Sequence, residues 1–203
     1  MHGDPTIGIG LGDGGETAAW PELRAYFQRI NVLTKNNLGV VMAACFGLYA
    51  IKQVSIEEPA PFHFLIGSQE VVYDDVIDAQ IKEFYRTMFR TSLLEEAMNQ
   101  VDKTFQQFHV EKYFAVSYGK YIKNGLTGGG RAARINRIVE ETLTKKGLPR
   151  TEENMAPLRA VLEEQMKPTL ENFKKYADVF MIGRYSLSFD ALLEWATQSK
   201  DVA

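Results

Sequence analysis

Apolar and polar positions in the first hundred residues follow two patterns, one typical of buried strands and one typical of amphipathic helices. The run Leu38–Cys45 is almost entirely apolar and is bounded by turn residues, and the shorter run Phe62–Ile66 ends at Gly67. Apolar runs of this length are typical of strands covered on both faces of a parallel sheet. Apolar residues at three- and four-residue steps predict helices over residues 23–33 and 76–101.

The second half of the chain has helical periodicity and no pattern typical of a strand. The predicted helices lie near residues 108–123, 131–146, 153–166, 169–181 and 188–198. A run of three glycines at residues 128–130 indicates a hinge, and Pro168 divides the helical stretch around it. We therefore predict an α/β fold in two parts, with a partial parallel sheet and flanking helices over residues 1–102 and an all-helical region over residues 103–203.

Composition narrows the class of protein. The 203 residues carry a net charge of −3 and include one cysteine, which excludes an internal disulfide and favours a reducing, cytoplasmic setting. No apolar run reaches the length of a membrane span, and the N-terminus lacks the basic and apolar stretches of a secretory signal. We therefore expect no membrane partner.

Basic residues gather in one stretch of the second half. Residues 111–150 carry nine Lys or Arg against three Asp or Glu, which makes nucleic-acid binding an alternative. We favour a solvated helical surface, because the whole chain is acidic and no aromatic platform lies between these basic residues. We therefore expect no nucleic acid as a partner.

The only thiol lies where functional groups collect in α/β proteins. Cys45 ends a predicted parallel strand, although a lone cysteine at such a position is more often a small buried hydrophobe. A nucleophilic thiol needs a base, usually an imidazole. We interpret His63 as a satisfied core or face histidine and His109 as a packed or surface residue of a helix. His2, which precedes Gly3 in a polar loop, is the better candidate for a catalytic base.

Neither a metal nor a cofactor is predicted. No cluster of Cys, His and carboxylate residues has the spacing of a metal site. Gly10, Gly12 and Gly15 match the spacing of a nucleotide-binding loop, but no adequate strand precedes them and no Lys-Ser or Lys-Thr pair follows. A turn in a hairpin is the better interpretation of these glycines.

Two short motifs carry a resemblance to a known family. His2-Gly3 and the sequence Ala-Cys-Phe-Gly at residues 44–47 enclose a predicted hairpin, a helix and a strand, and His2 and Cys45 are 43 positions apart. In this order and spacing, residues 1–102 resemble the second half of a caspase-like cysteine peptidase of the caspase–hemoglobinase clan, especially its CHAT and bacterial caspase-like members. The strand at 61–66 and the aromatic helix that follows continue the resemblance.

The resemblance implies a hydrolase, specifically a cysteine endopeptidase that acts on a polypeptide substrate. Cys45 would be the nucleophile, and His2 the general base and acid. The backbone N–H groups of Gly3 and Cys45 would form the oxyanion hole. Ala43 stands where relatives have a residue that selects the P1 side chain, so the substrate preference is open.

One departure from the family pattern lowers the expected activity. The sequence starts one residue before the presumed catalytic histidine, so the strands and helices that precede it in the family are absent. We expect a truncated domain with weak or no peptidase activity alone, and a protein partner that completes or regulates it. The alternative hypothesis is a non-enzymatic caspase-like or helical protein-interaction module.

Overall fold

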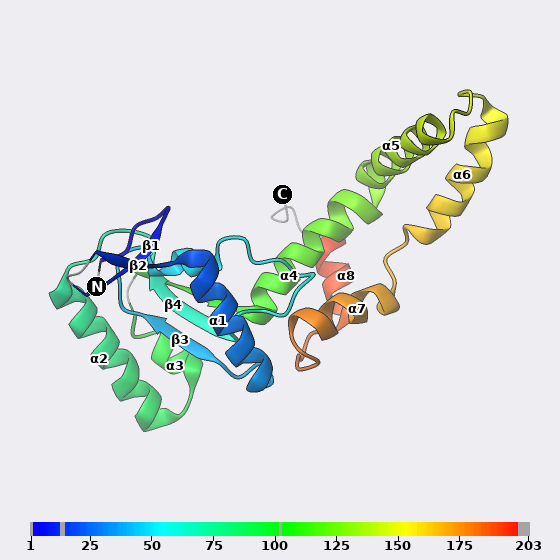
Figure 1. Ribbon diagram of the computed structural model, residues 1–203. Helices are drawn as coiled ribbons and strands as arrows, with labels where there is room; N and C mark the ends of the chain where they lie inside the picture. The colour runs from blue at the N-terminus through cyan, green and yellow to red at the C-terminus, as the bar shows by residue number, and fades with distance from the viewer. Residues whose placement is uncertain (1, 13–14, 102, 199–203) are drawn as a thin grey trace. The chain divides into compact units, whose positions relative to one another are not determined.

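The computed structural model describes residues 2–12, 15–101 and 103–198, and the chain divides into two compact units. Unit 1 comprises Met1–Lys112 and Val179–Arg184, and unit 2 comprises Tyr113–Asp178 and Tyr185–Ala203. Strands and helices mix in unit 1, whereas unit 2 is helical (Figure 1). The predicted class, an α/β fold with a helical C-terminal region, is therefore confirmed.

Unit 1 contains a hairpin and a three-stranded sheet. The hairpin pairs β1 (Gly8–Leu11) with β2 (Glu16–Ala19) in antiparallel fashion. The sheet has the order β3-β4-β5, in which β3 (Gly39–Met42) and β4 (Phe64–Ser68) run parallel and β5 (Phe105–His109) is antiparallel to β4. The two apolar runs of the sequence thus form the predicted parallel pair.

Strand β5 has no counterpart in the sequence analysis. Phe105 and Phe108 are buried, and the two glutamines between them are exposed. Apolar residues three positions apart are typical of a helix rather than of a strand, whose side chains alternate with a period of two. Pairing with β4 therefore overrides the local pattern, and the helix that follows begins only at Val110.

Helices cover both faces of the sheet. The helices of unit 1 are α1 (Trp20–Leu33), α2 (Asp74–Thr91) and α3 (Leu94–Met98), with a short 3-10 helix η1 (Gly47–Ile51). On one face, Ile66 packs in a core cluster with Phe84 of α2. On the other, Phe27 of α1 contacts Phe62 edge to face, and Phe62 contacts Phe108 in the same way. The sheet is thus enclosed between α1 and the pair α2–α3 (Figure 1).

A fully buried carboxamide fixes the connection between α1 and β3. The Asn31 side chain donates to the Ala60 carbonyl at 2.9 Å and to the Asn36 carboxamide oxygen at 3.1 Å. It also accepts the backbone N–H of Leu38 at 3.0 Å, one residue before β3 begins. Because Asn31 faces the core, two of the apolar residues whose spacing predicted this helix face solvent instead: Tyr26 is 62% exposed and Leu33 is 81% exposed.

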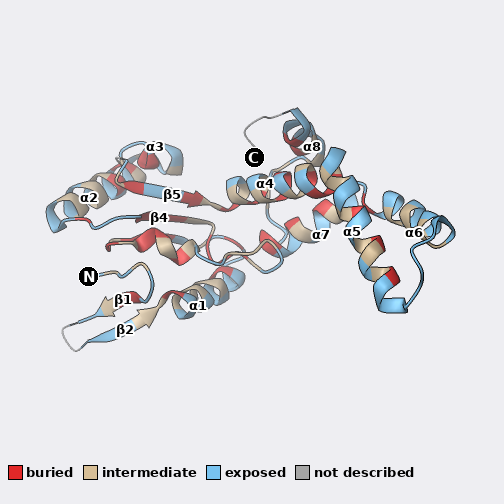
Figure 2. Ribbon diagram, turned by 90° about the horizontal axis from the view of Figure 1, so that it is seen from above, coloured by how far each residue is buried: buried red, intermediate tan, exposed pale blue. Residues whose placement is uncertain are grey.

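Unit 2 is built around aromatic side chains. Its helices are α4 (Val110–Tyr121), which begins in unit 1, and α5 (Gly128–Lys146), α6 (Glu152–Gln165), α7 (Leu170–Phe180) and α8 (Phe189–Gln198), with a π-helical turn η2 (Ile122–Leu126). The buried rings of Phe114, Tyr118 and Phe173 contact one another. Helix α6 buries none of its residues (Figure 2). Among the helices described, none is long and apolar enough to cross a membrane.

Candidate functional site

Cys45 lies in a tight turn at the carboxyl end of the parallel strand pair. It follows β3 by three residues, and the next residue, Phe46, has a φ of 57°, which is unusual for a bulky side chain. The backbone N–H of Phe46 donates to the Glu70 carbonyl at 3.1 Å. A Cβ built on Gly47 would lie 2.6 Å from the Met42 side chain, so the turn needs glycine there. Backbone bonds and close packing therefore hold the cysteine in place.

The His2-Gly3 segment lies directly against this turn. A Cβ built on Gly3 would come within 1.8 Å of the backbone carbonyl oxygen of Cys45, a distance no real side chain could adopt. Gly3 also forms an antiparallel bridge with Ile9, in which the Gly10 N–H donates to the His2 carbonyl at 2.8 Å. The segment is thus held between β1 and the Cys45 turn, and only glycine fits at position 3.

The backbone N–H groups of Gly3 and Cys45 make no hydrogen bond within the described chain. The hydrogen bonds of the Gly3–Ile9 bridge are made by the residues on either side of Gly3, so the N–H of Gly3 itself points away from the hairpin. Within the described ranges, no acceptor is bonded to the N–H of either Gly3 or Cys45. These are the two groups that the resemblance implies as an oxyanion hole.

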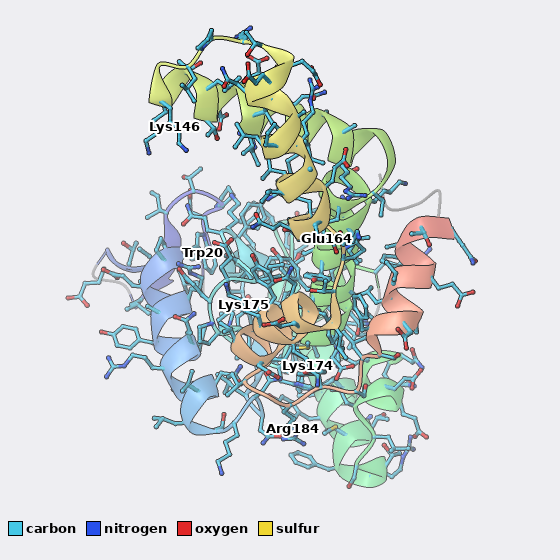
Figure 3. All side chains as sticks on the ribbon, turned by 90° about the vertical axis from the view of Figure 1, so that its right-hand side faces the viewer. Trp20, Lys146, Glu164, Lys174, Lys175 and Arg184 are labelled. Carbon is cyan, nitrogen blue, oxygen red and sulfur yellow. The ribbon has the colours of Figure 1, made fainter. Side chains whose placement is uncertain are left out.

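Asp4 and Trp20 position the segment, and the sequence analysis did not identify either of them. The Asp4 carboxylate accepts the hydroxyl of Thr6 and the backbone N–H groups of Thr6 and Ile7, and the hydroxyl bond is the largest cause that holds the pKa of Asp4 below its ordinary value. Trp20, which is labelled in Figure 3, begins α1. Its indole N–H donates to the Asp4 carbonyl at 2.8 Å. The indole thus ties the His2-Gly3 segment to the helix that leads to β3.

The thiol itself is enclosed. Cys45 is 7% exposed, and its sulfur exchanges two hydrogen bonds with one residue: it accepts the Val72 N–H at 3.4 Å and donates to the Val72 carbonyl at 3.6 Å. The His2 side chain is exposed, and no hydrogen bond joins its ring to the sulfur in the described part of the chain. The structure therefore brings the two motifs together through their backbones, whereas the ring and the thiol are not bonded.

The other two histidines form a pair on neighbouring strands. His109 is the last residue of β5 rather than part of a helix, and His63 immediately precedes β4. Their ring centroids are 4.9 Å apart at an interplanar angle of 69°. The Nδ1 atom of each ring is buried without a hydrogen-bond partner among the described residues. We expected the ring nitrogens of His63 to be hydrogen-bonded. For Nδ1 of His63 this expectation is wrong, because the two rings pack against each other.

This pair predicts that acid destabilises the protein. Burial is the main cause that lowers the pKa of His63 and of His109 below the ordinary value of about 6.5. Charges of Arg184 and Lys112 act in the same direction, and that of Glu111 opposes them. The unfolded chain then binds more protons, so the free energy of unfolding should fall as the pH falls below about 6.5. Urea unfolding between pH 5 and 8 measures how the free energy of unfolding depends on pH. A variant with both histidines changed to glutamine should lose most of this pH dependence.

A cavity of unit 2 lies between α5 and α6. It measures about 450 Å³ and is lined by Gly128, Arg131, Ala132, Ile135 and Glu163. The Arg131 guanidinium donates to the backbone carbonyl of Glu163 across it. The lining holds neither a thiol nor an imidazole, and among the described residues no group of three or more His, Cys, Asp or Glu is arranged to hold a metal ion.

Comparison with known proteins identifies no relative. No model of a protein family matches the sequence, and neither a curated protein nor a solved structure is significantly similar to it. A functional interpretation of this chain therefore depends on the geometry around Cys45.

Proposed function

We propose that the chain is a caspase-like cysteine endopeptidase, with Cys45 as the nucleophile and His2 as the general base and acid. One observation supports this most strongly: Gly3 packs so closely on the Cys45 carbonyl that no other residue fits, although the two residues are 42 positions apart. Burial of a structural cysteine would not by itself require a His-Gly segment at this contact. The proposal includes a polypeptide substrate and a cytoplasmic location, for which a single cysteine is typical.

The proposed chemistry is acyl transfer in two steps. The Cys45 thiolate attacks the peptide carbonyl carbon, and the negative charge that develops on the carbonyl oxygen is stabilised by the N–H groups of Gly3 and Cys45. His2, protonated by the thiol, gives its proton to the leaving amine as the C–N bond breaks. His2 then takes a proton from water, the water oxygen attacks the thioester, and the acid product leaves with the thiolate regenerated.

Low activity of the isolated polypeptide is part of this proposal. Cys45 is buried and its sulfur is bonded to Val72, so a substrate carbonyl cannot approach the sulfur to the roughly 3–3.5 Å that attack requires. The His2 ring must also move from its exposed position to within about 3 Å of the sulfur. A protein partner that favours this rearrangement would raise the activity.

Slow cleavage of a broad peptide library tests the proposal. Cleavage should be measurable with the intact chain and should be lost in Cys45→Ala and in His2→Ala, because each variant removes a group that the chemistry needs. The matched control is His63→Gln, which removes an imidazole elsewhere in unit 1 and should leave the rate within about twofold of the parent. Equal cleavage by the parent and by Cys45→Ala would refute the proposal.

A non-enzymatic protein-interaction module is the second candidate, and a different observation favours it. Tyr26, Ile30 and Leu33 form an exposed apolar ridge along α1, with 62%, 44% and 81% of their surfaces exposed. Contiguous apolar surface of this kind is typical of sites that bind another protein. Absence of cleavage by the parent chain, together with loss of a protein partner in Leu33→Glu, would favour this candidate over the peptidase.

A further inference from the structure

We propose that residues 69–73, which connect β4 to α2, form a strap that closes the Cys45 site and must open before a substrate can reach the thiol. The inference concerns the regulation of that site, and its functional meaning rests on the proposed peptidase activity. The strap is defined by its place in the chain, between Ser68 at the end of β4 and Asp74 at the start of α2.

Within the part of the chain that the structure describes, both hydrogen bonds of the thiol are made to the strap. The Val72 N–H donates to the sulfur at 3.4 Å, and the thiol donates to the Val72 carbonyl at 3.6 Å. Both groups belong to the backbone of one residue, so the sulfur cannot keep either bond when Val72 leaves. As long as the strap is in place, the sulfur has a donor and an acceptor but no room for the carbonyl carbon of a peptide.

Two further contacts fix the strap next to the cysteine. The Glu70 carbonyl accepts the N–H of Phe46 at 3.1 Å, which joins the strap to the residue after the nucleophile. The same carbonyl accepts the Ser68 hydroxyl at 3.1 Å, and the Ser68 oxygen accepts the Glu70 N–H at 3.0 Å. One backbone bond thus joins the strap to the Cys45 turn, and the Ser68 hydroxyl holds Glu70 against the end of β4.

Val72 is the single buried residue of the strap, and its side chain therefore keeps the strap closed. Val72 is 6% exposed and belongs to the core cluster of Ile66 and Phe84, whereas Val71 and Tyr73 on either side are 63% and 75% exposed. The closed position thus depends on one buried side chain, flanked by two that have little packing to lose. A local opening that withdraws Val72 would free the sulfur without unfolding α2 or the sheet.

The experiment measures the rate at which iodoacetamide alkylates Cys45, the only cysteine of the chain, in the folded protein. Val72→Ala should raise this rate at least tenfold, because it weakens the side-chain packing that holds the strap closed. Val71→Ala makes the same chemical change one residue earlier, on an exposed side chain, and should leave the rate within twofold. An unchanged rate in Val72→Ala would overturn the proposal.

A third variant separates opening of the strap from general loosening of the core. Val101→Ala removes the same atoms from a residue that packs on the same cluster but lies outside the strap. It should change the alkylation rate less than threefold, and an increase equal to that of Val72→Ala would count against a strap. If Val72→Ala does not fold, Ser68→Ala, which removes the hydroxyl anchor of Glu70, should raise the rate in its place.

Peptide cleavage by the same variants distinguishes this inference from the proposed function. If both are correct, cleavage and alkylation should rise together in Val72→Ala. Faster alkylation without any cleavage would support the strap and contradict the peptidase. Cleavage by the parent chain with no effect of Val72→Ala on either rate would support the peptidase and contradict the strap.

Discussion

Gly3→Ala is expected to lower peptide hydrolysis by about a hundredfold or more, although it removes no catalytic group. The new methyl group would lie 1.8 Å from the carbonyl oxygen of Cys45, and because both partners belong to the backbone no rotamer change relieves the clash. The His2-Gly3 segment must therefore move away from the turn. A displacement of about 1 Å shifts one oxyanion donor and the backbone that carries the imidazole, and displacements of this size cost about two orders of magnitude in rate.

The effect on stability should be smaller than the effect on activity. Overpacking of a native contact costs about 1–3 kcal/mol, and here the short segment before β1 moves more easily than the sheet. Gly129→Ala is the matched control, since a Cβ at Gly129 meets nothing within 4 Å. It should leave the rate unchanged and should, if anything, raise the urea midpoint slightly, because alanine is a better helix former than glycine near the start of α5. If Gly3→Ala retains full peptide hydrolysis, the contact between Gly3 and Cys45 has no catalytic importance.

The sequence predicted the framework of unit 1 because its patterns there are local. The two apolar runs became the parallel pair β3–β4, and the three- and four-residue periodicity became α1 and α2. Strand β5 was missed, since the spacing of Phe105 and Phe108 is helical and only pairing with β4 makes this segment a strand. Asn31 was missed for a similar reason: a polar residue gives no sign that three backbone and side-chain groups will surround it.

The candidate site was predicted in part. The order of the two motifs led us to expect that the His2 ring and the Cys45 thiol meet at the ends of adjacent parallel strands. The structure places Gly3 on the Cys45 carbonyl, but Gly3 is bridged to Ile9 of β1 in antiparallel fashion and no hydrogen bond joins ring and thiol among the described residues. The catalytic roles of these residues stay predictions. Val72 was beyond sequence reasoning, because it acts through its backbone, which is the same in every residue except proline. The ring contact between His63 and His109 likewise depends on strand register, which was not predicted.

Asn31→Leu is expected to lower the free energy of unfolding by about 3 kcal/mol. Leucine has nearly the same size but leaves the Leu38 N–H without its acceptor and the Ala60 carbonyl without its Asn31 donor, in a place that water does not reach. A buried polar group that loses its partner costs about 1–3 kcal/mol, and here two backbone groups lose a partner together. Urea unfolding followed by far-UV circular dichroism measures the loss.

The consequence for the site follows from where Asn31 acts. Its bond to the N–H of Leu38 sets the start of β3, and β3 leads directly to Cys45. We therefore expect iodoacetamide to react faster with Cys45 in Asn31→Leu even well below the unfolding midpoint. Asn99→Leu makes the same change at an exposed position and should alter stability by less than about 0.5 kcal/mol. Equal stability of the two variants would mean that the buried carboxamide does not hold α1 to β3.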